Sequence, residues 1–250
     1  MDVKTFIEML VKASNLKTLY IKGGFGHPLS EKNKKRLIDL YAYNEKIRAS
    51  IMGASDDTFA FDCCGLIKGI IWGFKGDKTK VYGGAKYETG GLSDVNEKGL
   101  LNLCSNISDD LTTVSPGDFL YMSGHCGIYI GNGNVIESSP KWKNGVQVTD
   151  INARKWKTHG RLPFIEYTPG EDKKEIYIIP AYYLSRGSMG PSVKNLQTCL
   201  NKAMNAGLTV DGIFGPLTKQ ALKNFQTKYN LSVDGIYGPQ SRNKLMEVLS

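Results

Sequence analysis

The stretch Phe61-Asp62-Cys63-Cys64-Gly65-Leu66 opens an amphipathic helix and carries the most informative chemistry of the chain. Apolar side chains follow on one helical face, at i, i+4, i+7, i+8 and i+11: Cys63, Ile67, Ile70, Ile71 and Phe74. We therefore predict a helix from Cys63 to Phe74. Asp62 is expected to cap its first turn.

A cysteine at the start of a helix lies beside unpaired backbone amides and the positive end of the helix dipole. Both stabilise a thiolate, and the same amides can help to hold an oxyanion. Cys63 is therefore a candidate nucleophile. A buried structural thiol is the commoner role of a single cysteine, and it stays open as the alternative.

Three histidines could act as the base for such a nucleophile. His125 stands in Ser123-Gly124-His125-Cys126-Gly127, at the expected start of a strand, where glycines leave an imidazole accessible. We expect His27 in a surface loop and His159 in a turn. His125 is the preferred base, with a structural imidazole as the alternative.

Helical patterns come first in the chain and strand patterns later. Residues 30–51 have apolar positions near helical spacing, and from Asp118 the period changes to that of strands. We expect strands at 118–122, 145–149 and 163–167, and a hairpin of 127–130 and 134–137 around Gly131-Asn132-Gly133. This order is typical of an α+β domain, which we place at residues 1–168.

The C-terminal part contains an internal repeat. Val210-Asp211-Gly212-Ile213-Phe214-Gly215-Pro216 returns 23 residues later as Val233-Asp234-Gly235-Ile236-Tyr237-Gly238-Pro239. Each copy combines an Asp-Gly turn with a Gly-Pro that starts a helix. With helices expected at 192–206, 217–229 and 240–249, residues 185–250 are predicted to form a small all-α three-helix domain. A polar linker, residues 169–184, precedes it.

The net charge of +8 lies unevenly along the chain. Residues 185–250 carry eight basic and three acidic side chains, so this part is the more basic one for its size. A basic domain suits an anionic polymer such as nucleic acid, a membrane surface or a cell wall. No basic patch with interleaved aromatic residues supports nucleic-acid binding, and no run of about 18 apolar residues supports an integral membrane segment.

Neither a metal nor a cofactor is indicated by the sequence. The five cysteines, at positions 63, 64, 104, 126 and 199, include no Cys-x-x-Cys pair, so we expect no zinc site. At the N-terminus, acids and lysines are mixed among the apolar residues, which is not the order of a signal peptide.

Four segments, in order, resemble the motifs of the NlpC-type papain-like cysteine peptidases, which cut peptidoglycan stem peptides, typically beside D-glutamate. They are Tyr20-Ile21-Lys22-Gly23-Gly24, Asp62-Cys63-Cys64-Gly65-Leu66, Pro116-Gly117-Asp118 and Gly124-His125-Cys126-Gly127-Ile128-Tyr129-Ile130-Gly131. The resemblance covers most of residues 3–168. It implies a papain-like α+β fold with helices packed on an antiparallel sheet.

The resemblance also implies roles for individual residues. Cys63 would be the nucleophile, His125 the base and Glu137, twelve positions further on, the third polar residue. Four residues would lie at the substrate: Tyr20, Asp62, Cys64 and Gly124.

Two positions depart from the family pattern. Cys64 stands where the family often has serine, and the place at the helix start favours Cys63 as the reacting thiol. Glu137 stands where the family has His, Asn or Gln. A three-residue loop at 132–134 would put Glu137 opposite Tyr129, on the face of His125 but about 13 Å along the strand from it. Only a bulge or strong coiling would bring the two together.

The C-terminal repeat, with Leu196-Gln197 and Phe225-Gln226, resembles a peptidoglycan-binding module with a three-helix core. The resemblance implies peptidoglycan as the partner. We expect four residues near the ligand face: Asp211, Phe214, Asp234 and Tyr237. Structural turn residues are the alternative for both aspartates.

Together these features predict a cell-wall hydrolase that cleaves an amide bond of the stem peptide through an acyl-enzyme, as a phage or prophage endolysin does. It would be made in the bacterial cytoplasm and released to the wall through a pore or by lysis. The alternatives are a bacterial autolysin, an amidase that cuts the muramoyl–L-alanine bond, and a non-catalytic wall-binding protein. The oligomeric state is not indicated.

Overall fold

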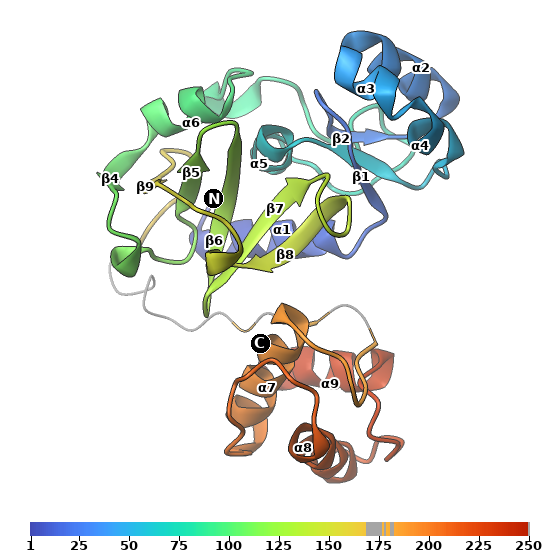
Figure 1. The fold of residues 1–250 in the computed structure, drawn as a ribbon, viewed down its shortest axis with the longest axis vertical. Coiled ribbons are helices and arrows are strands. Elements are labelled where there is room, and N and C mark those ends of the chain that lie inside the picture. The colour runs from blue at the N-terminus through green and yellow to red at the C-terminus, as the bar shows by residue number, and fades with distance from the viewer. Residues whose placement is uncertain (169–176, 178, 181–182, 250) are drawn as a thin grey trace. The chain divides into compact units, whose positions relative to one another are not determined.

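The chain divides into two compact units, Met1–Lys174 and Glu175–Ser250 (Figure 1). The computed structural model describes residues 1–168, 177, 179–180 and 183–249. Much of the predicted linker at 169–184 lies outside these residues. Two described residues near its end, Pro180 and Leu184, accept hydrogen bonds from Tyr237. Among the described helices, none has the length and apolar character needed to cross a membrane.

A six-stranded antiparallel sheet forms the centre of the N-terminal unit, in the order β4-β9-β5-β6-β7-β8 (Figure 1). The strands are β4 (Ser105–Ser108), β5 (Phe119–Met122), β6 (His125–Gly131), β7 (Asn134–Ser139), β8 (Gly145–Asp150) and β9 (Thr158–Arg161). The predicted strands that correspond to β5–β8 are confirmed. The one predicted at 163–167 is wrong: the chain turns at Pro163, and the strand that pairs with β5 is β9.

Two helices, α1 (Val3–Ser14) and α5 (Cys63–Ile71), contact the strands β6–β8 and each other. α5 is the predicted cysteine helix, and it ends three residues before Phe74. α1 was not predicted. A further helix, α6 (Glu97–Leu103), packs against α5 and β5. The α+β class with helices packed on an antiparallel sheet is thus confirmed.

A small sheet in the order β1-β3-β2 adjoins this layer, with β1 (Thr18–Tyr20), β2 (Phe25–Pro28) and β3 (Phe59–Phe61). The single helix predicted at 30–51 is instead three helices: α2 (Glu31–Leu40), α3 (Ala42–Lys46) and α4 (Arg48–Gly53). The backbone is extended at Tyr41, which separates α2 from α3. The buried Asn44 side chain donates to the carbonyl of Leu37, and so replaces a helical hydrogen bond at the break.

His27 lies in β2 and not in a surface loop. Its ring is 1% exposed and makes edge-on contacts with Phe25 and Tyr82. Burial, aided by the nearby Arg36, lowers the pKa of His27 to about 4. The histidine is therefore an aromatic-cluster residue of the core and is neutral at neutral pH.

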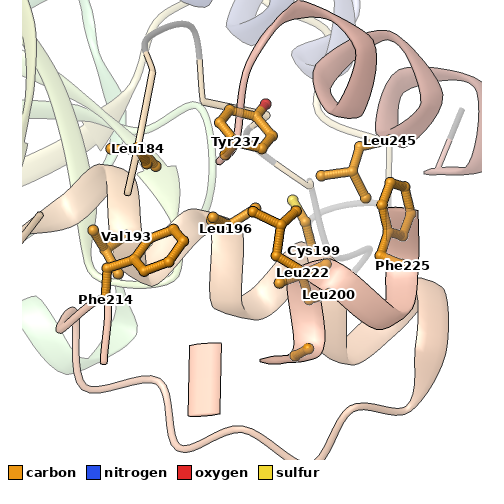
Figure 2. Packing of buried hydrophobic residues seen from close by; sticks show 11 residues of the cluster. Leu184, Val193, Leu196, Cys199, Leu200, Phe214, Leu222, Phe225, Tyr237 and Leu245 are labelled. Atoms are coloured by element: carbon orange, nitrogen blue, oxygen red, sulfur yellow. The ribbon is translucent and has the colours of Figure 1, made fainter. Parts of the chain in front are cut away.

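The C-terminal unit has the three predicted helices, α7 (Pro191–Met204), α8 (Pro216–Lys228) and α9 (Pro239–Leu249). Each begins on the proline of a Gly-Pro pair, as expected of residues with a fixed φ and no amide hydrogen. Figure 2 shows the apolar core between them, which includes Leu196, Cys199, Phe225 and Leu245.

Phe214 and Tyr237, the aromatic residues of the two repeats, also belong to this core. Each side chain is 1% exposed, so neither offers a ligand a contact surface. Their expected place on a ligand face is corrected accordingly. An aromatic side chain after an Asp-Gly turn contributes more by filling the core of so small a domain than by lying on its surface.

The two aspartates of the repeat are turn residues held by glutamine side chains. Gln197 Nε2 donates to Asp211 Oδ1 (2.8 Å), and Gln226 Nε2 donates to Asp234 Oδ1 (2.8 Å). Each glutamine oxygen accepts the amide of the glycine that follows the aspartate, Gly212 or Gly235, at 2.9 Å in both copies. These contacts account for both aspartates as parts of the fold.

Candidate active site

The start of α5 is locked to the loop after β1. Asp62 caps the helix by accepting the amide of Gly65 (2.6 Å), and its second oxygen accepts the amide of Gly23 (2.7 Å). A Cβ on Gly65 would lie 1.8 Å from the carbonyl oxygen of Gly24, so only glycine permits this approach. The Asp-Cys-Cys-Gly motif thus places Cys63 on the first turn of α5.

Cys63 and His125 face each other between α5 and the start of β6. The two groups interact electrostatically, and the imidazole lies nearly parallel to the indole of Trp156, with ring centres 5.7 Å apart. Contacts from the Cys126 and Cys64 thiols, together with His125, hold the pKa of Cys63 well below its usual value, although burial opposes this. Burial also disfavours the imidazolium, but hydrogen bonds to Cys63 and Glu137 raise the pKa of His125. The pair therefore favours thiolate and imidazolium.

Glu137 lies directly behind His125. Its Oε2 atom is 2.5 Å from His125 Nε2, which leaves the other ring nitrogen for Cys63. The carboxylate is fully buried and accepts two further hydrogen bonds, from Thr149 Oγ1 (2.7 Å) and Arg154 Nε (2.7 Å). Against the cost of burial, these three partners lower the pKa of Glu137, so the carboxylate is ionised beside the imidazole.

The expected register of Glu137 is wrong, because the β6–β7 turn is shorter than three residues. Asn132 and Gly133 alone form it, both with positive φ (53° and 72°), as in the tight hairpin turns that match strand twist. The register also shifts between Tyr129 and Gly131, and Ile128 pairs with Ile136. Glu137 therefore comes two positions nearer to His125 than expected.

Two more thiols surround the nucleophile position. Cys64 Sγ is 3.9 Å from Cys63 Sγ and 3.6 Å from Cys126 Sγ. The nearby Cys63 charge and burial raise the pKa of Cys64, although contact with Cys126 opposes this, and burial raises the pKa of Cys126. Of the three thiols, only Cys63 has a lowered pKa, which favours it over Cys64 as the nucleophile.

A cleft of about 600 Å³ opens at the start of α5. Its lining includes all four residues expected at the substrate: Tyr20, Asp62, Cys64 and Gly124. Burial and the neighbouring Cys63 charge raise the pKa of Asp62 to about 6, and burial raises the pKa of Tyr20. Asp94 and Glu97 also line the cleft. The nucleophile is thus reached from a cleft with several acidic groups.

His159 is not a turn residue and lies apart from this cluster. It is buried in β9, where its Nδ1 atom is 2.8 Å from Asp118 Oδ2 and its Nε2 atom 3.0 Å from Thr113 Oγ1. Asp118, from the Pro-Gly-Asp segment, also accepts the amide of Ser115 (2.9 Å). These contacts attach β9 to the turn before β5.

Sequence reasoning missed Thr149, Arg154, Trp156 and Cys126 as members of the site. Gln147 pairs with Glu137, and Thr149, two residues further along β8, lies on the same face of the sheet. A correct β7–β8 register would therefore have indicated Thr149. Arg154 follows β8 in an irregular stretch, and nothing in its local pattern marks it. Cys126 follows His125, but its contact with Cys64 depends on how α5 packs on β6.

Comparison with known proteins agrees with this architecture. Residues 48–162 match the model of the NlpC/P60 family, and residues 189–245 match that of a peptidoglycan binding domain. The chain therefore carries an NlpC/P60 domain followed by a domain of the peptidoglycan-binding family. No curated protein matches it.

Three solved structures illustrate the similarity. The N-terminal domain of SleB is 36% identical over 28% of this chain and 94% of its own, with a TM-score of 0.27. A fused Zn-dependent amidase/peptidase/peptidoglycan-binding domain-containing protein from Clostridium acetobutylicum ATCC 824 is 39% identical over 26% of this chain and 28% of its own (TM-score 0.25). NlpC2 from Trichomonas vaginalis is 16% identical over 64% of this chain and 46% of its own (TM-score 0.30). The matched parts span less than half of the latter two chains.

Proposed function

We propose that the protein is a peptidoglycan hydrolase that cleaves an amide bond of the stem peptide by cysteine catalysis. The observation that carries the proposal is the bond of His125 to Glu137, beside a Cys63 thiol that interacts with His125 and lines an open cleft. The NlpC/P60 and peptidoglycan-binding domains support the wall as the substrate. The bond beside D-glutamate is the proposed point of cleavage, on the family resemblance.

In the proposed reaction, the Cys63 thiolate attacks the amide carbonyl. The amides of the first turn of α5 hold the oxyanion. His125 gives its proton to the leaving amine and then takes one from the water that hydrolyses the acyl-enzyme. Glu137 stabilises the imidazolium between these steps and fixes the ring by its bond to Nε2.

The C-terminal domain is proposed to hold the enzyme on the wall. It carries five more positive than negative side chains, which suits an anionic wall, and tethering raises the local concentration of substrate without changing the chemistry. Release of a cytoplasmic enzyme to the wall through a pore or by lysis, as for a phage or prophage endolysin, completes the proposal. A bacterial autolysin has the same chemistry.

Mass spectrometry of fragments released from purified peptidoglycan tests the activity and the bond together. The full chain should release peptides that end at D-glutamate, and Cys63→Ala should release none. Peptides with a free N-terminal L-alanine, together with muramic acid whose lactyl carboxylate is free, would identify an amidase instead. If the wild type binds the wall but releases nothing, the protein is a non-catalytic wall-binding protein.

A further inference from the structure

Three cysteine sulfurs converge where the sequence spacing indicates no metal site. Cys63 and Cys64 come from the first turn of α5, and Cys126 comes from β6, 62 residues beyond Cys64. All three Sγ atoms lie within 4.8 Å of one another, with two of the separations at 3.9 and 3.6 Å.

The triangle has the dimensions of a thiolate coordination shell. In a tetrahedral zinc site with Zn–S bonds of about 2.3 Å, neighbouring sulfurs are about 3.8 Å apart. The Cys63–Cys64 and Cys64–Cys126 sulfur separations, 3.9 and 3.6 Å, differ from that value by at most a few tenths of an ångström. A cation could therefore contact all three sulfurs with little movement of α5 or β6.

The surroundings suit a soft cation. Cys126 is completely buried, so its sulfur is fixed in place, whereas Cys63 and Cys64 line the cleft and leave a route for entry. Thiolates select zinc and similar soft ions over magnesium and calcium, which prefer oxygen ligands. The N-terminus of the nine-residue helix α5 stabilises the net negative charge of three thiolates around a divalent ion.

We propose that Cys63, Cys64 and Cys126 form a binding site for a thiophilic divalent cation such as Zn²⁺, and that the bound ion blocks the nucleophile. The ion binds without redox change, and thiols that are protonated release their protons to water as the Zn–S bonds form. The inhibitory part of this inference rests on the proposed function, because it needs Cys63 to be the nucleophile. The binding part does not.

Metal content and cobalt spectra of the reduced full chain test the binding directly. After loading with Zn²⁺ and gel filtration, we expect one Zn²⁺ per chain. After the same treatment with Mg²⁺, we expect no bound Mg²⁺. With Co²⁺ as the probe, a thiolate-to-metal charge-transfer band should appear in the near ultraviolet. Cys64→Ser and Cys126→Ala should each weaken zinc binding at least about tenfold, since even loss of outer-shell partners costs that much. Cys104→Ser and Cys199→Ala are matched controls from outside the triangle and should bind zinc as the wild type does.

Alkylation of Cys63 by iodoacetamide provides a second readout that needs no substrate. Zinc should protect Cys63 in the wild type, and chelation by EDTA should restore labelling. If Cys126→Ala fails to fold, the wild-type cobalt spectrum and Cys64→Ser carry the test. Absence of the charge-transfer band, or unchanged zinc affinity in Cys64→Ser, would overturn the site. A chelated, zinc-free protein that is inactive on peptidoglycan but still binds added zinc would refute the proposed function alone.

Discussion

Arg154 and Glu137 form a buried ion pair behind His125, with 2.6 Å between Arg154 Nη2 and Glu137 Oε2. The same guanidinium nitrogen donates to Ser139 Oγ (2.7 Å). Arg154 therefore does not touch the proposed nucleophile but holds the carboxylate that orients its base. This pair makes a glutamate usable at a position where an uncompensated buried charge would be costly.

Loss of Arg154 should destabilise the N-terminal unit. Arg154→Met leaves the Glu137 carboxylate buried without its cation, which we expect to cost about 3–5 kcal/mol in free energy of unfolding. Arg154→Lys keeps the charge but loses the planar guanidinium, so its loss of unfolding free energy should be smaller than that of Arg154→Met. Urea unfolding measures both. Equal stability of Arg154→Met and the wild type would contradict the structural importance of the pair.

Glu137→Gln should shift the pH dependence of hydrolysis. Glu137 raises the pKa of His125, so removing its charge lowers that pKa, and the basic limb of the kcat/KM profile should move to lower pH. Activity should be weakened in Glu137→Gln and weakened more in Glu137→Ala. A Glu137→Ala enzyme with the wild-type rate and profile would show that the orienting residue lies elsewhere.

Substitution of each of the two neighbouring cysteines by serine should give opposite results. Cys63→Ser should abolish hydrolysis, because a hydroxyl at this position is not ionised by His125. Cys64→Ser should remain active, because the pKa of the Cys64 thiol is raised and this thiol is not the nucleophile. Serine is also of similar size. Wall pelleting checks that both variants still bind. An active Cys63→Ser with an inactive Cys64→Ser would reverse the assignment.

The glutamine of each repeat should stabilise the C-terminal unit. Gln226→Ala removes the acceptor of the Gly235 amide and one donor to Asp234, which keeps the amide of Ile236, and we expect this loss to cost about 1–3 kcal/mol. Gln220→Ala is the matched control, because Gln220 bonds only the exposed Asn224. Thermal unfolding compares the two variants. Equal melting temperatures would show that the contacts of Gln226 do not stabilise the C-terminal unit.

Separation of the two units should divide activity from targeting. A chain ending at Lys174 should cleave soluble muropeptides but lose activity on intact walls, since the tether is gone. A chain of residues 185–250 should fold by its own core and pellet with walls. Turbidity loss of wall suspensions provides the readout. Equal wall lysis by the shortened and full chains would exclude a targeting role.

Patterns along the chain predicted those parts whose cause is local. Helical spacing located α5, and the duplicated Asp-Gly and Gly-Pro pairs located the helices of the C-terminal unit. The strand β9 was missed because Thr158–Arg161 has no large apolar residue. It forms a strand through pairing with β5 and the buried contact of His159 with Asp118.

The candidate site shows the same division. Cys63 and His125 stand out by their neighbours in the sequence, since one begins a helix and the other a strand. The contact of His125 with Glu137 depended on a turn one residue shorter than expected and a register shift. Arg154 reaches Glu137 from outside any regular element, so only the folded structure reveals it.

The glycine contact between α5 and the loop after β1 has a consequence for how the cleft can adapt. The backbone of Gly24 accepts the amide of Asp62 and lies close to Gly65, so the loop after β1 is held directly against the first turn of α5, which carries Cys63. Asp94 and Glu97, which also line the cleft, are attached through side chains: Asp94 pairs with Lys68, and Glu97 accepts the amide of Gly124. If the proposed function holds, adjustment to substrates of different bulk should fall to the side of the cleft that carries Asp94 and Glu97. Variation there should retune selectivity while the reacting atoms stay in alignment.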